Sequence, residues 1–111
     1  MDIVFASPRL EKLCNDDRKA TREWGRAQAD LLGRRLDDLH AATVLEDLRN
    51  GPGDPHELKG DRAGQLAMDL VGGDRLIFEP ADDPVPRKPD GGLDWRLVTA
   101  VRILGVEDYH G

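Results

Sequence analysis

The spacing of hydrophobic residues changes once along this 111-residue chain, and that change limits the possible folds more than any other feature. On the segment 24–39 they recur every three or four positions, as on an amphipathic helix. On the segment 66–78 they recur every second position, as on a strand with one buried face. Between the two lies the run 50–55, Asn-Gly-Pro-Gly-Asp-Pro, which cannot continue a helix. Helices followed by strands predict an α+β fold.

The first half predicts a short strand followed by helices. Residues 2–6 alternate loosely between apolar and other side chains and form the strand. Ser7-Pro8 provides an N-cap followed by proline at the first helical position, which predicts a helix over 8–14. The other helical segments are a longer helix capped by residues 15–17 and running to Leu39, and one or two turns at 44–48.

The second half begins with a β-hairpin. Strand 65–71 is expected to turn at 72–74 into a second strand that starts at Arg75. A three-residue loop pairs Leu70 with Leu76 and Met68 with Phe78, which keeps one face of the hairpin apolar. In this register the Arg75 side chain points away from the core and lies diagonally near Asp69.

The last third combines a loop and a strand. Four prolines and Asp90-Gly91-Gly92 predict a long loop inserted at 80–95, and the β-branched segment 97–106 predicts the last strand. The length fits one domain over 1–111. The order of elements predicts helices packed on one face of a small antiparallel sheet.

Composition narrows the class of protein. With 39% hydrophobic and 34% charged residues, the chain is typical of a soluble globular protein. Cys14 is the only cysteine, so an internal disulfide is excluded. The N-terminus lacks a signal-peptide pattern and the longest apolar run is too short to span a bilayer, so we expect a cytoplasmic protein that does not bind membranes. The net charge of −6 argues against sequence-blind binding of nucleic acid, and any RNA-facing site must be a local basic cluster.

Two segments and one arginine carry the candidate chemistry. They are His56–Gly64 (His-Glu-Leu-Lys-Gly-Asp-Arg-Ala-Gly), Asp108-Tyr109-His110 and Arg75. Together they contain two imidazoles for acid–base work, cations that can neutralise a phosphate, and a ring on which a base can stack. The sequence contains no Cys/His cluster with metal spacing, no phosphate-binding glycine loop and no nucleophile elbow.

The order and spacing of these segments resemble a known family. The stretches His56–Gly64, Arg75-Leu76-Ile77-Phe78 and Asp108-Tyr109-His110 are similar to those of the HigB-type plasmid-maintenance killer proteins of the RelE/ParE superfamily. The segment 40–48 also looks like this family, and the likeness covers most of the chain outside 80–95.

The resemblance implies a RelE-like fold and a ribosome-dependent mRNA endoribonuclease. It also implies a HigA-like helix-turn-helix antitoxin as partner, with operator DNA bound only through the antitoxin complex. Carried over by position, the catalytic or activity-critical residues are His56, Lys59, Arg75, Asp108, Tyr109 and His110. Arg62 is a further candidate for substrate binding.

The chemistry that the family implies uses no metal and no other cofactor. The RNA 2′-OH attacks the adjacent phosphorus and leaves a 2′,3′-cyclic phosphate and a 5′-OH. His56 and His110 are the candidate proton carriers, because imidazole titrates near neutral pH. Lys59 and Arg75, helped by Arg62, would stabilise the charge on the phosphoryl oxygens.

Other interpretations of the same residues stay open. Lys59 and Arg62 beside Glu57 and Asp61 also fit a solvated charge cluster, and Arg75 also fits a simple bridge to Asp69. The acidic net charge and the lack of an aromatic residue before Arg75 leave two alternatives to the mRNA endoribonuclease open. One is a non-catalytic ParE-like toxin that binds a protein such as gyrase. The other is a weakened toxin that acts mainly through antitoxin and operator-DNA binding.

Overall fold

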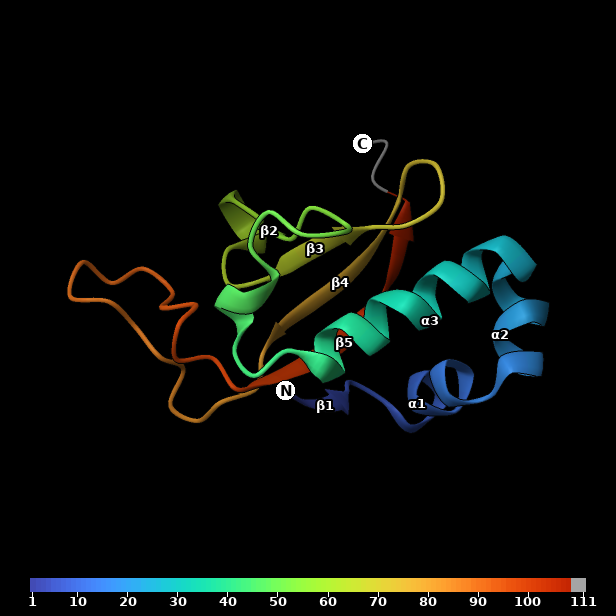
Figure 1. The fold of residues 1–111 in the computed structure, drawn as a ribbon, viewed down its shortest axis with the longest axis horizontal. Coiled ribbons are helices and arrows are strands. Elements are labelled where there is room, and N and C mark those ends of the chain that lie inside the picture. The colour runs from blue at the N-terminus through green and yellow to red at the C-terminus, as the bar shows by residue number, and fades with distance from the viewer. Residues whose placement is uncertain (109–111) are drawn as a thin grey trace.

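The computed structural model describes residues 1–108, which form helices on one side of a five-stranded sheet (Figure 1). The helices are α1 (Pro8–Asn15), α2 (Asp17–Trp24) and α3 (Arg26–Ala41), with short 3-10 helices η1 (Leu45–Leu48) and η2 (Gly60–Arg62). The strands are β1 (Asp2–Phe5), β2 (His56–Glu57), β3 (Leu66–Asp69), β4 (Asp74–Pro80) and β5 (Ala100–Asp108). The predicted α+β class, with helices on one face of a small sheet, is confirmed.

The strands lie in the order β1-β5-β4-β3-β2. Neighbours are antiparallel except for β1, which runs parallel to β5 at one edge. The first strand of the chain therefore lies beside the last one, and β2 forms the opposite edge. The sequence did not predict β2, a strand of only two residues within the candidate segment His56–Gly64.

The long helix expected from residues 15–17 to Leu39 is two helices. Asp16 caps α2 by accepting hydrogen bonds from the N–H groups of Arg18 and Lys19, as its position predicts. The chain then breaks at Gly25, whose φ of +83° and ψ of +161° fit neither helix. An L side chain rarely adopts this φ, so glycine ends α2 and lets α3 start in a new direction.

The hairpin register differs from the predicted one by two residues. Met68 lies opposite Leu76, Asp69 lies opposite Arg75, and the Leu70 N–H donates to the Asp74 carbonyl. The loop is therefore 71–73 and not 72–74. Because the slip is an even number of residues, each side chain keeps its face, and Arg75 points away from the core as predicted.

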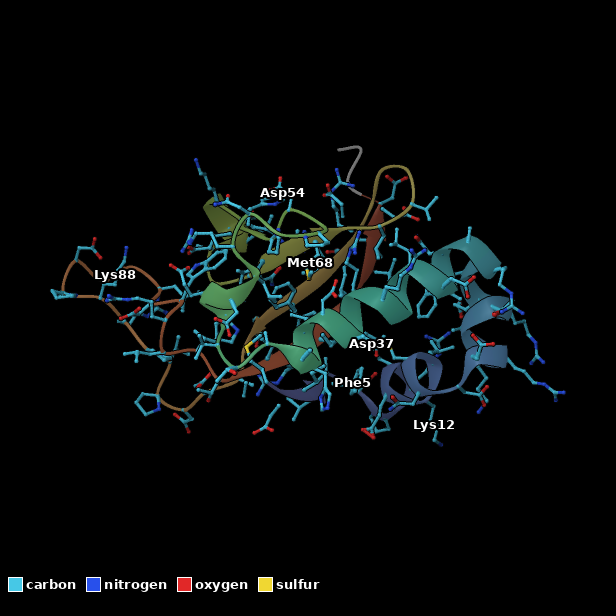
Figure 2. All side chains as sticks on the ribbon, in the orientation of Figure 1. Phe5, Lys12, Asp37, Asp54, Met68 and Lys88 are labelled. Carbon is cyan, nitrogen blue, oxygen red and sulfur yellow. The ribbon has the colours of Figure 1, made fainter. Side chains whose placement is uncertain are left out.

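The main core lies between the sheet and α3. It contains the side chains of β3, β4 and β5 that face the helices, together with Leu32 and Leu39 of α3. Figure 2 shows Met68 in this layer, between its strand and the helix. A smaller cluster of Leu58, Ala67 and Ile77 lies on the other face of the sheet. The sheet is thus apolar on both faces at its centre.

The Pro-rich segment joins β4 to β5 as a long loop that extends from one end of the molecule (Figure 1). Although Lys88 lies at its exposed end (Figure 2), Leu93 and Trp95 return to the main core, where Trp95 is 5% exposed. Trp95 donates to a Glu57 carboxylate oxygen at 3.0 Å, and the Arg49 guanidinium lies over its ring.

The final strand starts at Ala100, three residues later than predicted. Within residues 1–108, each helix is too short or too polar to cross a bilayer.

Candidate functional site

The candidate site lies on the face of the sheet that the helices leave uncovered. Three ion pairs between neighbouring strands or loops cross this face. They join Arg75 to Asp69, Arg62 to Glu107 and Arg102 to Glu79. The guanidinium groups of Arg75, Arg62 and Arg102 are therefore each beside a carboxylate.

Arg75 occupies the second position of β4, opposite Asp69 on β3 and Glu107 on β5. Its Nε lies 3.0 Å from an Asp69 carboxylate oxygen, and its Nη1 donates to the Asp74 carbonyl at 2.9 Å. The side chain is 25% exposed. These contacts hold the guanidinium close to the sheet while leaving part of its donor edge open to solvent.

Side chains of α3 fix the hairpin that carries Arg75. Gln28, which is 5% exposed, donates to the Asp74 carboxylate at 2.6 Å and accepts from the Val71 N–H at 2.8 Å. Arg35 donates from Nε to the Asp69 carbonyl at 3.1 Å. Both ends of the 71–73 loop are thus anchored to one helix. This anchoring fixes the position of Arg75 in β4.

Arg62 comes from a different part of the chain and contacts Glu107, the neighbour of Arg75 on β5. It belongs to η2, where its Nε donates to Gln65 at 2.8 Å, and one of its terminal nitrogens pairs with Glu107. Glu107 in turn lies opposite Arg75 in the sheet. The residues Arg62, Glu107, Arg75 and Asp69 therefore form one continuous row of alternating charge across β5, β4 and β3.

Lys59 and His56 are not paired with this row. Lys59 is exposed and precedes η2, and none of the ion pairs within residues 1–108 includes it. His56 is exposed and lies opposite Ala67, with Nδ1 2.9 Å from the Asp54 carbonyl. Its strand is two strand spacings, about 10 Å, from that of Arg75.

The third candidate segment is described only at its first residue. Asp108 ends β5, exposed and opposite Asp74, beside the row that contains Arg75 and Glu107. Tyr109 and His110 lie outside the described residues. Arg62, Arg75 and residues 107–108 therefore meet at one end of the sheet, and the prediction that the His110 imidazole lies near Arg75 and Lys59 stays a prediction.

A β-bulge determines which way Glu107 points. Ile77 lies opposite Gly105 and Phe78 opposite Ile103, so Leu104 is the additional residue on β5. Without it, strict alternation would place Glu107 on the core face with Ile103. Glu107 is not recognisable as a site residue from the sequence, because a bulge leaves no reliable signal in the hydrophobic pattern.

The arrangement suits the binding of a phosphodiester better than that of a metal ion. Residues 1–108 contain no group of three or more His, Cys, Asp or Glu side chains placed to hold a metal. They do contain guanidinium groups of Arg62 and Arg75, whose planar forks fit a phosphate. A phosphate would compete there with Glu107 and Asp69.

Neither a protein-family model nor a curated protein matches the chain. Solved structures do match in fold. A YoeB/ParE toxin from Agrobacterium tumefaciens superposes with a TM-score of 0.60 at 12% identity, over all of both chains. The YoeB dimer and the YoeB–YefM complex from Staphylococcus aureus each give 0.58 at 18% identity, over all of this chain and 98% of the other. At these identities the likeness shows a shared fold.

Proposed function

We propose that this protein is the toxin of a type II toxin–antitoxin pair, of the HigB type within the RelE/ParE superfamily, and that it cleaves mRNA on the ribosome. One observation carries the proposal. Cations from separate parts of the chain, Arg62 and Arg75, meet on the uncovered face of the sheet, next to the strand end that leads to Tyr109 and His110. Solved toxins of the YoeB/ParE kind share this fold over their whole length.

The proposed reaction is a metal-free transesterification followed by release of the cleaved strand. The RNA 2′-OH gives its proton to an imidazole, the oxygen attacks phosphorus, and the 5′ oxygen leaves as a hydroxyl after taking a proton from a second group. His56 and His110 are the proposed proton carriers. Arg75, Lys59 and Arg62 would stabilise the additional negative charge of the pentavalent state, and Tyr109 would orient a base. Asp108 would orient these groups at the end of the strand.

The proposed partners follow from the same assignment. We propose that residues 1–111 act as one toxin domain in the cytoplasm, with mRNA and the ribosome as targets. A HigA-like helix-turn-helix antitoxin would neutralise it, and operator DNA would be bound only through their complex. The solved YoeB–YefM complex supports a protein partner for this fold.

A second candidate is a toxin with weak cleavage that acts mainly by binding its antitoxin. The ion pairs favour it, because Asp69 and Glu107 lower the positive potential at Arg75 and Arg62. A third, a ParE-like toxin that binds gyrase, needs none of the candidate side chains for acid–base chemistry.

Expression in growing cells with primer-extension mapping of mRNA separates these functions. The nuclease predicts new mRNA 5′ ends that disappear in a His110→Ala variant. Defects in DNA supercoiling without new ends would support the gyrase-binding toxin. Absence of both, with retained antitoxin binding, would support the weakened toxin.

A further inference from the structure

The strand β1 has an unpaired edge. Its N–H groups at Asp2 and, one residue past its end, at Ala6 donate to Thr99 and Ile103 of the β5 side. Because alternate residues of a strand direct both backbone groups to the same side, those of Ile3 and Phe5 point away from β5. No strand within residues 1–108 other than β5 pairs with β1. Ile3 and Phe5 therefore offer two donors and two acceptors to another chain.

The helix layer extends past this edge and leaves a cleft of about 470 Å³ beside it. Ile3 and Phe5, both half-buried, form one wall with Leu36 of α3. The other lining residues are Glu11 and Asn15 of α1, and Asp37 and His40 of α3. Figure 2 shows Phe5 and Asp37 close together at this edge. The cleft has the position that the side chains of one more strand would occupy.

The charge around the cleft is negative. None of its lining residues is lysine or arginine, and within residues 1–108 no ion pair includes Glu11 or Asp37. Asp2, exposed on β1, adds a third carboxylate along the same edge. Lys12 lies on the side of α1 turned away from α3 (Figure 2). This charge disfavours nucleic acid, and it disfavours a second copy of the chain, whose β1 edge would bring the same three carboxylates.

We propose that the β1 edge is the docking site for an extended, basic segment of a partner protein, which adds to the sheet as a sixth strand. Its backbone pairs with Ile3 and Phe5, alternate apolar side chains fill the cleft, and lysine or arginine residues lie near Glu11 and Asp37. The inference rests on the proposed function in one respect, that the antitoxin is the expected partner. The surface is separate from the row that contains Arg75, so binding here leaves the RNA-facing side uncovered.

Selection from a library of displayed random peptides on the immobilised full-length protein tests the proposal. The expected peptides alternate apolar residues with lysine or arginine. On addition of a selected peptide, hydrogen exchange of the Ile3 and Phe5 amides should slow, while that of the Val4 amide, which faces β5, should change little. A peptide N-methylated at the residues that face β1 should bind at least tenfold more weakly than one N-methylated at the intervening residues.

Charge reversal supplies the matched control. Asp37→Lys should weaken the selected peptide at least tenfold, whereas Asp61→Lys, an identical charge change on η2, should leave its affinity within twofold. Failure to select such peptides, or equal effects of the two variants, would overturn the proposal. Slow exchange of Ile3 and Phe5 in a free protein of dimeric mass would assign the edge to a second copy instead. These measurements involve no RNA cleavage, so they stand or fall independently of the nuclease.

Discussion

The side chain of Arg75 combines two demands that usually conflict. A residue that binds phosphate needs free donors, whereas a residue held rigidly needs partners of its own. Arg75 meets both because Nε contacts Asp69 and Nη1 contacts the Asp74 carbonyl, leaving other donors of the guanidinium for a ligand. Preorganisation of this kind would avoid the entropy loss of ordering a flexible arginine on binding the proposed RNA target.

Replacement of Arg75 should therefore affect function far more than stability. Its ion pair is partly exposed, and such pairs contribute about 0–1 kcal/mol. We expect Arg75→Ala to abolish toxicity while changing the free energy of unfolding by less than about 1 kcal/mol. Growth after induction and urea denaturation of the purified variant measure the two effects. An unfolded variant would show that Arg75 is structural and that the site assignment is wrong.

Glu107 should weaken RNA binding by its proximity to Arg62 and Arg75. The variant Glu107→Gln should raise the affinity for a single-stranded RNA oligonucleotide and steepen the dependence of log K on log salt by up to about 0.7, the slope for one additional phosphate contact. Asp30→Asn changes the net charge equally on the helix layer and serves as control. If both variants shift the binding curve alike, general charge and not this pair controls affinity.

At the scale of elements, α3 connects the core to the candidate site. It buries Leu32 and Leu39 against the sheet, and it directs Gln28 and Arg35 to the two ends of the 71–73 loop. The packing of one helix therefore sets the register of the β3–β4 hairpin.

Loss of the Gln28 amide should release the loop from the helix. We expect Gln28→Ala to lower the free energy of unfolding by about 1–3 kcal/mol, because it leaves Asp74 and the Val71 N–H without this partner. Chemical denaturation measures the loss. Arg34→Ala, an exposed substitution on the same helix, should stay within about 0.5 kcal/mol. Equal effects of the two variants would contradict the anchoring role of Gln28.

Gly53 illustrates a close approach between the run 50–55 and α3. Its φ is +83°, and a Cβ there would lie 2.7 Å from the Nε of Arg35. Gly25 has the same φ but open space around it. Both Gly→Ala variants should be destabilised by roughly 1–2 kcal/mol from backbone strain. Gly53→Ala should lose a further 1 kcal/mol, about the value of the Arg35 hydrogen bond to Asp69 that it displaces, as thermal unfolding would reveal.

These elements also show what the sequence could and could not predict. The face of Arg75 was predictable because alternation is insensitive to an even slip in register. The register itself was not, since a three-residue loop fits 71–73 as well as 72–74 and the choice depends on Gln28, 43 residues away. The orientation of Glu107 likewise depends on the bulge at Leu104, which is a property of the β4–β5 pair and not of either strand alone.

Across the whole molecule, the pattern of charged side chains differs between the uncovered face of the sheet and the β1 edge. The uncovered face of the sheet alternates cations and carboxylates, whereas the residues lining the cleft at the β1 edge include Glu11 and Asp37 but no lysine or arginine. Although the net charge is −6, the uncovered face of the sheet can still hold a phosphate site. The β1 edge, in contrast, favours a basic partner.

Asp82 gives the stability of the molecule a dependence on acid pH. Its carboxylate accepts from the Thr99 hydroxyl at 2.7 Å and from the N–H groups of Thr99 and Ala100, which closes the long loop onto the start of β5. Burial acts to raise the pKa of Asp82, but these hydrogen bonds outweigh it and lower the pKa below the usual value of 3.8.

Since the folded-state pKa of Asp82 lies below the unfolded one, its stabilisation is present above about pH 4 and is lost as the pH falls through the folded value. Asp82→Asn should therefore destabilise the protein by about 1 kcal/mol at pH 7 and by less at pH 2–3. Urea denaturation at both pH values measures the difference. A loss that is the same at both would contradict the assigned role of the carboxylate.

We propose that the row containing Arg75 stabilises an RNA phosphodiester during its cleavage. Cleavage of a defined mRNA on purified ribosomes, with analysis of the product ends, tests it most directly. We expect 2′,3′-cyclic phosphate ends from the wild-type protein and a rate at least about 100-fold lower for a folded Arg75→Ala variant. Equal rates for the two proteins, or no cleavage by the wild type, would contradict it.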